Sequence, residues 1–144
     1  MNHVPFSVED YVAHRGRMKL LDEIVEVNAQ KAVARSVATD KWPLAGADGI
    51  LPIVVVELVA QTAGINIRWE ELREAGGRKK EGSGLLVGLK EAVFHVLRIP
   101  LDATIITCAA KKHIYMNYAV YQGFSQIGEQ IIGSATIQVL RTDE

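Results

Sequence analysis

The stretch GILPIVVVELVAQTAG, residues 49–64, is almost entirely apolar, yet it carries a carboxylate and an amide in its middle. Glu57 and Gln61 lie four positions apart, so in a helix their side chains share one face. The segment from Ile53 to about Arg73 is the one stretch long enough for a substantial helix, and its first half is apolar nearly all round. Such a helix must be enclosed by other elements.

The segments on either side of this helix predict β-strands. Before it, residues 18–28 and 31–39 are rich in β-branched residues with partial alternation, which favours an antiparallel pair. Glycines and prolines make residues 40–52 a loop by composition. After the helix, a charged, glycine-rich connector over 70–84 precedes strands predicted at 85–94, 103–112, 114–122 and 130–140, with 123–129 as a hairpin connection.

A short helix is also predicted near the N-terminus, with Ser7 as its N-cap and a break at Gly16. At 144 residues the chain has the size of one domain. The order of elements predicts a single α+β domain over residues 1–144, in which an antiparallel sheet of five or six strands wraps around one long helix.

Composition narrows the possible partners. Sixteen basic and 17 acidic residues leave a formal charge of −1, which argues against nucleic acid and against an anionic membrane surface as partners. The longest apolar run, Ile50 to Val56, is far shorter than the roughly 20 residues needed to cross a bilayer. The N-terminal residues do not read as a signal peptide. We therefore expect no membrane association and a cytoplasmic location.

Motifs for other chemistries are missing from the sequence. Cys108 is the only cysteine, which excludes an internal disulfide and a cysteine-based metal cluster and fits a reducing compartment. No serine stands in a G-x-S-x-G setting, and GSGLLVG lacks the spacing of a phosphate-binding loop. We expect no metal and no other cofactor.

Three regions carry a resemblance to a known family. AHRGRMKLLDEIVEV (13–27) looks like a Leu-Pro-His-Arg segment leading into a strand with Leu-Asp, LPIVVVELVAQTAG (51–64) is similar to a helix motif ending in Glu-Ala-x-Ala-Gln, and KEAVFHVLRIPLDATI (90–105) resembles the strand and turn before a Pro-Gly-Asp. On these segments the chain resembles the hotdog-fold beta-hydroxyacyl-ACP dehydratases over most of its length. It looks most like a divergent branch of predicted 3-hydroxyacyl-ACP dehydratases found with aryl-polyene biosynthesis proteins.

The resemblance implies a hotdog fold and a dehydratase-like action on 3-hydroxyacyl thioesters in fatty-acid or polyene-type biosynthesis. The substrate would arrive on acyl carrier protein or as a coenzyme A thioester. Such a dehydration needs a base beside the thioester carbonyl and an acid at the departing hydroxyl. In the family a histidine and the helix carboxylate share these proton transfers, and Glu57 matches the carboxylate.

The histidine is where this sequence departs from the family. The family places it in a His-Phe-Pro-Gly turn ahead of the helix, and the usual spacing from Glu57 leads to Trp42 and Pro43. No histidine lies between residues 40 and 57. His14, in a family-like segment where the family's histidine is structural, and Asp48 are the candidates to replace it.

The candidate catalytic residues are therefore Glu57 and His14. The candidate substrate contacts are Gln61, Trp42, Asp48 and Pro52. His95 and His113 fall in strand patterns and are expected to be structural.

Other interpretations of the same residues stay open. Glu57 is as well explained as a hydrogen-bonded or interface carboxylate, with Gln61 as its local partner in a positioning role, because a buried carboxylate must be paired. An acyl-thioester hydrolase would use Glu57 to activate water and need no histidine. A non-catalytic, acyl-binding partner subunit of an active homologue is the third possibility.

Two expectations concern partners. Unpaired sheet edges and a half-covered helix predict a homodimer or higher oligomer, and in the family the sites lie at the dimer interface. The basic residues 78–80 are expected in a solvated loop that could contact an acidic carrier protein.

Overall fold

The computed structural model describes residues 7–11, 18–74 and 83–142. Its helices are α1 (Val8–Tyr11) and α2 (Val54–Glu74). Its strands are β1 (Glu23–Val27), β2 (Lys31–Val37), β3 (Ala45–Gly46), β4 (Gly49–Ile50), β5 (Ser83–Phe94), β6 (Thr104–Tyr115), β7 (Tyr118–Ile127) and β8 (Gln130–Thr142).

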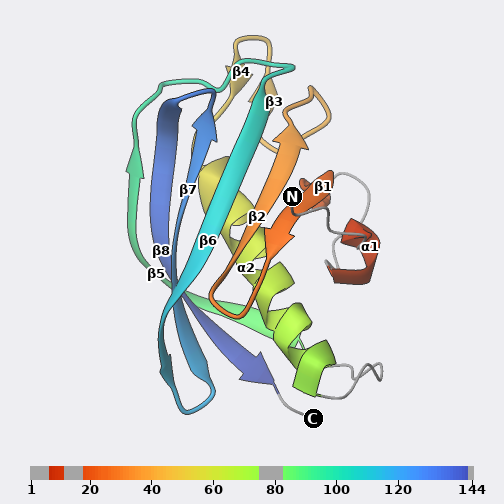
Figure 1. Cartoon of the computed structure of the whole chain (residues 1–144). Helices are drawn as coiled ribbons and strands as arrows, with labels where there is room; N and C mark the ends of the chain where they lie inside the picture. Colours follow the sequence, from red (N-terminus) through yellow and green to blue (C-terminus); the bar gives the residue numbers. More distant parts are fainter. Residues whose placement is uncertain (1–6, 12–17, 75–82, 143–144) are drawn as a thin grey trace.

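Six strands form one antiparallel sheet in the order β1-β2-β6-β7-β8-β5, and β3 pairs only with β4. The sheet curls around α2, which lies along one of its faces (Figure 1). We call this the inner face and the opposite one the outer face. The predicted order of two strands, one long helix and four strands is confirmed, and the main sheet has six strands.

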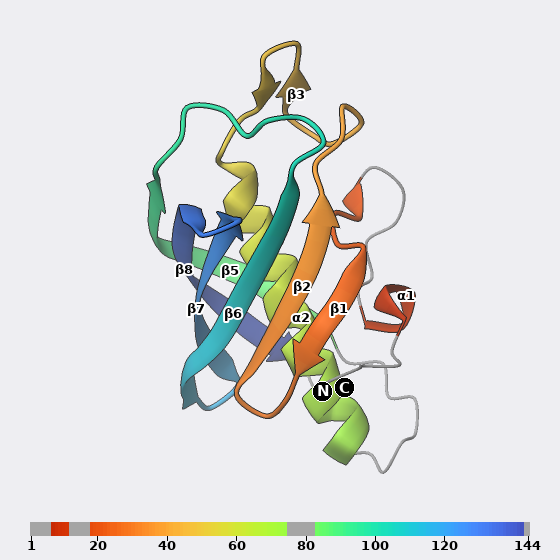
Figure 2. The same ribbon diagram turned by 45° about the horizontal axis from the view of Figure 1, so that its top comes forward.

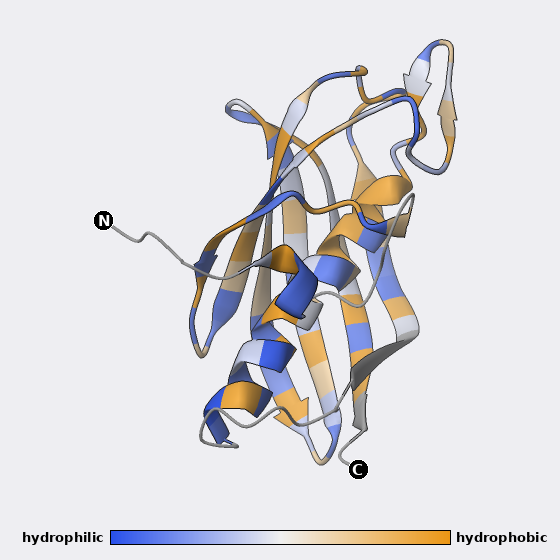
Figure 3. Cartoon of the chain, turned by 90° about the vertical axis from the view of Figure 1, so that its right-hand side faces the viewer, coloured by the Kyte–Doolittle hydropathy of each residue, from blue (hydrophilic) through white to orange (hydrophobic). Residues whose placement is uncertain are grey.

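The core forms between α2 and the inner face. Alternate residues of β2 are buried, beginning with Ala32 and Ala34, and alternate residues of β7 are buried from Ala119 onward. Apolar residues dominate the first turns of α2, whereas hydrophilic residues become frequent toward its end (Figure 3). In the described ranges, no helix is both long and apolar enough to cross a membrane.

The first half of α2 lies very close to the sheet at Gly123. A Cβ atom at this position would stand 2.7 Å from Val59 Cγ1 and 2.7 Å from the carbonyl oxygen of Cys108. Glycine therefore allows the helix to approach β7 where any other residue would force it away. This approach fixes the height of the neighbouring turns of α2 above the sheet.

A turn between β6 and β7 lies where the sequence predicts one continuous strand. The sequence predicts one strand over 114–122, but β6 ends at Tyr115 and β7 begins at Tyr118. Met116 has a φ of 57°, so the chain turns there without glycine or proline. The predicted face shared by residues 114, 116, 118 and 120 is wrong, because this turn divides it.

The next turn is also shifted from its predicted place. The sequence predicts residues 123–129 as the connection between two strands, but β7 continues through Ile127. Gly128 and Glu129 alone make the turn, and Gly128 has a φ of 58°. Apolar and small residues such as Gly123 belong to the buried face of β7 rather than to a loop.

The predicted loop before α2 contains a small hairpin. Strands β3 and β4 project beyond the end of the main sheet, near the start of α2 (Figure 2). Ile50 and Ile99 exchange two backbone hydrogen bonds of 2.9 Å, which attach this hairpin to the segment between β5 and β6.

The predicted N-cap is confirmed at α1. The backbone N–H of Glu9 donates to Ser7 Oγ over 3.3 Å, and Val8 is buried against the core. Lys19 forms an ion pair with Glu9. The hydrogen bond from Lys19 is the main cause that lowers the pKa of Glu9 to about 2.

Candidate functional site

Gln61 is the centre of the candidate site. It is buried in α2 at 3% exposure. Its Nε2 donates to the backbone carbonyl of Met18 over 2.7 Å and to Glu57 Oε2 over 3.0 Å, while its Oε1 accepts the N–H of Leu20 over 3.1 Å. One amide therefore satisfies two backbone groups of the segment that leads into β1 and also holds the Glu57 carboxylate.

Glu57 lies in the first turn of α2 and is only half-buried. The backbone N–H groups of residues 54–56, at this helix start, already donate to the carbonyls of residues 51–53. Gln61 restrains one carboxylate oxygen, so the side chain is held in one orientation. A fixed carboxylate at a helix start can accept or donate a proton at one place on a bound substrate.

The surroundings of Glu57 on α2 are apolar. Ile53, the residue just before α2, is 52% exposed, and Val56 and Ala60 of the helix are partly buried. Leu51, just ahead of the helix, is also exposed. This side of α2 therefore offers a carboxylate within an apolar surface, which suits an acyl chain attached to a polar reacting group.

The structure brings together only some of the predicted residues. Glu57 and Gln61 are joined directly by their hydrogen bond. Trp42 is buried at 6% exposure within the core, and Pro52 is partly buried just before α2. Asp48 is exposed in the turn between β3 and β4, in the hairpin that projects beyond the sheet.

Some predicted groups lie outside the described residues. His14 is one of them, and the basic residues 78–80 are another. Of the described histidines, His113 belongs to β6 and His95 follows β5, and both are exposed. In the part of the chain that the structure describes, no group of three His, Cys, Asp or Glu side chains could hold a metal ion.

Sequence reasoning missed two members of the site, the carbonyl of Met18 and the N–H of Leu20. Both are backbone groups, so no residue type marks them in the sequence. It also missed a second polar group on α2, in which the Tyr121 hydroxyl donates to Asn66 Oδ1 and Asn66 Nδ2 donates to the carbonyl of Asn28 over 2.6 Å. The asparagine within the apolar helix was the available signal for this second group.

A comparison with protein families gives one match. A model of ApeP-like proteins, described as ApeP dehydratase, matches residues 6–144. No curated protein sequence matches the chain.

Solved structures show the fold. A chain of the dehydratase heterocomplex ApeI:P from Xenorhabdus doucetiae matches with a TM-score of 0.83 and 14% identity, over 96% of this chain and 93% of that one. An HP0420 homologue from Helicobacter felis matches with a TM-score of 0.71 and 14% identity, over 100% and 94%. A hypothetical thioesterase with coenzyme A from Streptococcus pneumoniae matches with a TM-score of 0.65 and 13% identity, over 85% and 86%. The expected α+β hotdog fold is confirmed.

Proposed function

The chain belongs to the ApeP-like dehydratase family, and from this premise we propose that it acts on 3-hydroxyacyl thioesters through the carboxylate of Glu57. The family supports a dehydratase-like function. The observation that carries the assignment to a site is the Glu57–Gln61 hydrogen bond of 3.0 Å on α2. It holds a half-exposed carboxylate in place beside apolar surface.

In the proposed reaction, a base removes the proton at C2 while the C3–O bond breaks and the hydroxyl leaves as water. The C2–H electron pair becomes the new C2=C3 double bond. Glu57 would protonate the departing hydroxyl, since it is the carboxylate that Gln61 orients. His14 remains our proposal for the second proton-transfer group, and Gln61 is the positioning residue.

The other proposed contacts take supporting roles. Pro52 and Asp48 flank the start of α2 in the chain, so they are proposed to border the acyl thioester there. Trp42 would act from the core by supporting the loop ahead of α2. No cofactor is needed for this chemistry.

We propose an acyl carrier protein as the carrier of the thioester. The coenzyme A in the structure of the streptococcal thioesterase supports thioester binding by this fold and leaves coenzyme A as the alternative carrier.

The match of the family model to residues 6–144 supports one domain over residues 1–144. The lone Cys108 fits the proposed cytoplasmic location.

We further propose that the protein works as a homodimer or higher oligomer. Strand β5 ends the main sheet, and within the described residues no strand pairs with its outer edge. Leu89, Val93, Phe94 and Leu97 are exposed on β5 and just after it. An apolar strand at a sheet edge is a template for pairing with another chain. Sedimentation velocity should show at least a dimer at micromolar concentration in both low and high salt, and a clean monomer would contradict this.

Two other functions have support from particular observations. A thioesterase is favoured by the match to a protein of that description, and Glu57 would then activate water that breaks the acyl C–S bond. A partner subunit is favoured by the match to one chain of a dehydratase heterocomplex.

One set of assays separates the three functions. The purified protein would be given 3-hydroxyacyl and saturated acyl thioesters of several chain lengths, on acyl carrier protein and on coenzyme A. Formation of the 2-enoyl product supports the dehydratase, whereas release of free thiol supports the thioesterase. If neither product forms across the series, the dehydratase proposal fails, and stimulation of an active dehydratase by the added chain then supports the partner subunit.

A further inference from the structure

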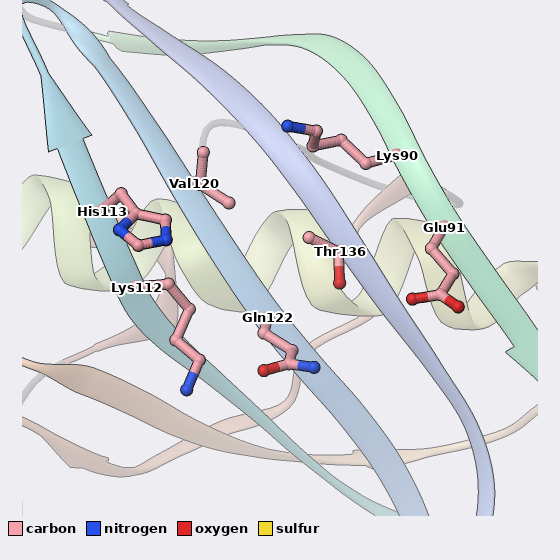
Figure 4. A pocket seen from close by; sticks show the side chains of 7 residues that line it. All are labelled: Lys90, Glu91, Lys112, His113, Val120, Gln122 and Thr136. Carbon is pink, nitrogen blue, oxygen red and sulfur yellow. The ribbon is translucent and has the colours of Figure 1, made fainter.

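The outer face of the sheet, opposite α2, carries a hollow of about 770 Å³ (Figure 4). Strands β5, β6, β7 and β8 contribute residues to it, and α2 passes behind them (Figure 4). Its lining consists of Lys90 and Glu91 from β5, Lys112 and His113 from β6, Val120 and Gln122 from β7, and Thr136 from β8.

Two β-bulges place lysines at the two sides of this hollow. The pairing of β6 with β7 shifts register between Lys111 and His113, so Lys112 is the extra residue. The pairing of β5 with β8 shifts between Leu89 and Glu91, so Lys90 is the extra residue there. A bulge redirects a side chain from the regular alternation of its strand, and bulges recur next to functional surfaces.

These two lysines are available for a partner. Both are exposed, and in the part of the chain that the structure describes neither makes an ion pair. Glu91 is the one acid among the lining residues, so the hollow has an excess of positive charge. Gln122 and Thr136 add uncharged hydrogen-bonding groups between the two lysines.

An aromatic surface continues from the hollow toward the turn between β6 and β7. Tyr115 pairs with Tyr118 in the register, two positions beyond the pair of His113 with Val120. Tyr115 is 73% exposed and Tyr118 is 39% exposed. Met116 between them is 83% exposed. Its φ of 57° is a backbone conformation that residues other than glycine rarely adopt. Tyrosine and methionine are enriched where proteins dock.

The sheet separates this surface from the proposed active site. Gly123, next to Gln122 in β7, faces the inner side, where an added Cβ would collide with Val59 of α2. An acyl group at Glu57 therefore lies on the other side of the sheet from the hollow. Whatever occupies the hollow serves assembly or recognition rather than the reaction itself.

Charge decides between the possible occupants. If two copies of this chain met hollow to hollow, Lys90 and Lys112 of each copy would bring four lysines against two copies of Glu91. Like charges placed together oppose such an interface. A partner with clustered carboxylates would instead be attracted, and it would find uncharged donors between the lysines.

We propose that the outer face, at Lys90, Lys112, Tyr115 and Tyr118, docks an acidic segment of a different protein. Carboxylates of the segment pair with the two lysines across the hollow, and its apolar side chains pack on the two tyrosines. This role is independent of the chemistry proposed for Glu57.

The test uses a synthetic peptide rich in glutamate with interspersed leucine and phenylalanine, and a twin in which glutamine replaces every glutamate. Titration into the full chain should shift the NMR signals of Gln122, Thr136 and Tyr115, and salt should weaken the binding. The glutamine twin should bind about tenfold more weakly, since it loses the same charge pairs and keeps the apolar contacts. The double variant K90Q/K112Q should bind the acidic peptide about tenfold more weakly, the scale of two surface charge pairs.

A control variant and a second variant of the proposed surface test the specificity of the binding. Lys41→Gln removes an exposed lysine in the loop before β3 and should leave peptide affinity unchanged. Tyr115→Ser should weaken the peptide without lowering the melting temperature, because this side chain is 73% exposed.

Four results would overturn the proposal. They are absence of peptide binding at millimolar concentration, equal affinity for wild type and the double variant, full competition by inorganic phosphate at micromolar concentration, and a self-association of the wild type that the double variant abolishes. The last two would assign the hollow to a small anion or to a second copy.

Discussion

The two polar groups on α2 are built from similar side chains but end in different surroundings. In the second half of the helix, Asn66 is 0% exposed and accepts a hydrogen bond from Tyr121 of β7, which is 1% exposed. In the first half, Gln61 is equally buried, but its hydrogen bonds lead to Glu57, which is half-exposed. The Asn66–Tyr121 group lies entirely within the core, whereas the Gln61–Glu57 group extends to the surface.

This difference separates a structural role from the catalytic role that we propose for Glu57. The side-chain amide of Asn66 joins α2 to β7 through Tyr121 and to the turn after β1 through the carbonyl of Asn28. Its oxygen and its nitrogen are therefore both hydrogen-bonded within the protein. The Gln61 group also ties α2 to backbone, at residues 18 and 20, but it additionally fixes a carboxylate on an apolar surface. We therefore expect changes in the Gln61–Glu57 group to affect turnover and changes in the Asn66–Tyr121 group to affect stability alone.

The largest expected effect is that of Glu57→Gln on turnover. The change keeps the size of the side chain and an oxygen that can accept from Gln61, but it removes the ionisable group. Turnover of the 3-hydroxyacyl thioester should fall about 10²-fold or more, roughly 2.7 kcal/mol in the barrier. The free energy of unfolding in urea should change by less than about 0.5 kcal/mol.

The matched control for Glu57 is Glu70→Gln in the same helix. Glu70 accepts a hydrogen bond from Lys111 Nζ over 3.3 Å, so the control also removes a carboxylate with a partner. It should leave turnover unchanged. If Glu57→Gln merely lowers the melting temperature and keeps full turnover, Glu57 is a structural carboxylate.

Gln61→Leu should affect both properties, because Gln61 belongs to both the core and the site. The buried N–H of Leu20 loses its acceptor, so stability should fall by about 1–3 kcal/mol. Turnover should fall about tenfold with an unchanged KM, since Glu57 loses its donor but the apolar surface remains.

Thr62→Val is the control for Gln61, because it removes a neighbouring hydrogen bond of 2.7 Å from Thr62 Oγ1 to the carbonyl of Leu58. It should leave kcat unchanged. A loss of stability in Gln61→Leu with kcat at the wild-type level would remove Gln61 from the site.

Tyr121→Phe tests the buried Asn66–Tyr121 group. It leaves the buried Asn66 Oδ1 without the Tyr121 donor, so stability should fall by about 1–2 kcal/mol while turnover of the folded protein stays at the wild-type level. Tyr118→Phe, at an exposed tyrosine of the same strand, should change stability very little. Reduced turnover in folded Tyr121→Phe would mean that the two halves of α2 are coupled.

The smallest expected effect is that of Lys19→Met at α1. The hydrogen bond from Lys19 is the largest of the causes that lower the pKa of Glu9 to about 2, below its ordinary 4.5. Because the folded-state pKa is lowered, the pair stabilises the fold fully above about pH 4.5 and loses this effect as the pH falls toward 2. The exposed position limits its size. In Lys19→Met, NMR titration should find the Glu9 pKa closer to 4.5, and an unchanged value would contradict the role of Lys19.

Local patterns were enough to predict α2, the order of strands around it and the N-cap at Ser7. Helical periodicity also placed Glu57 and Gln61 on one face, because residues four apart in a helix are neighbours whatever the rest of the fold does. Strand limits were less predictable. Tyr115 to Tyr118 form a turn without glycine or proline, so their alternation resembled one continuous strand.

The sequence by itself therefore determined the hotdog arrangement, the family and the carboxylate–amide pair on the central helix, since each depends on residues close together in the chain. Only the tertiary structure decided that Gln61 is held by the backbone of residues 18 and 20, and that Lys90 and Lys112 flank one hollow. The hydrogen bonds of Gln61 join groups more than 40 positions apart in the chain. The placement of the two lysines depends on two bulges in separate strand pairs. Neither backbone hydrogen bonding nor strand register can be predicted from the type of any single residue.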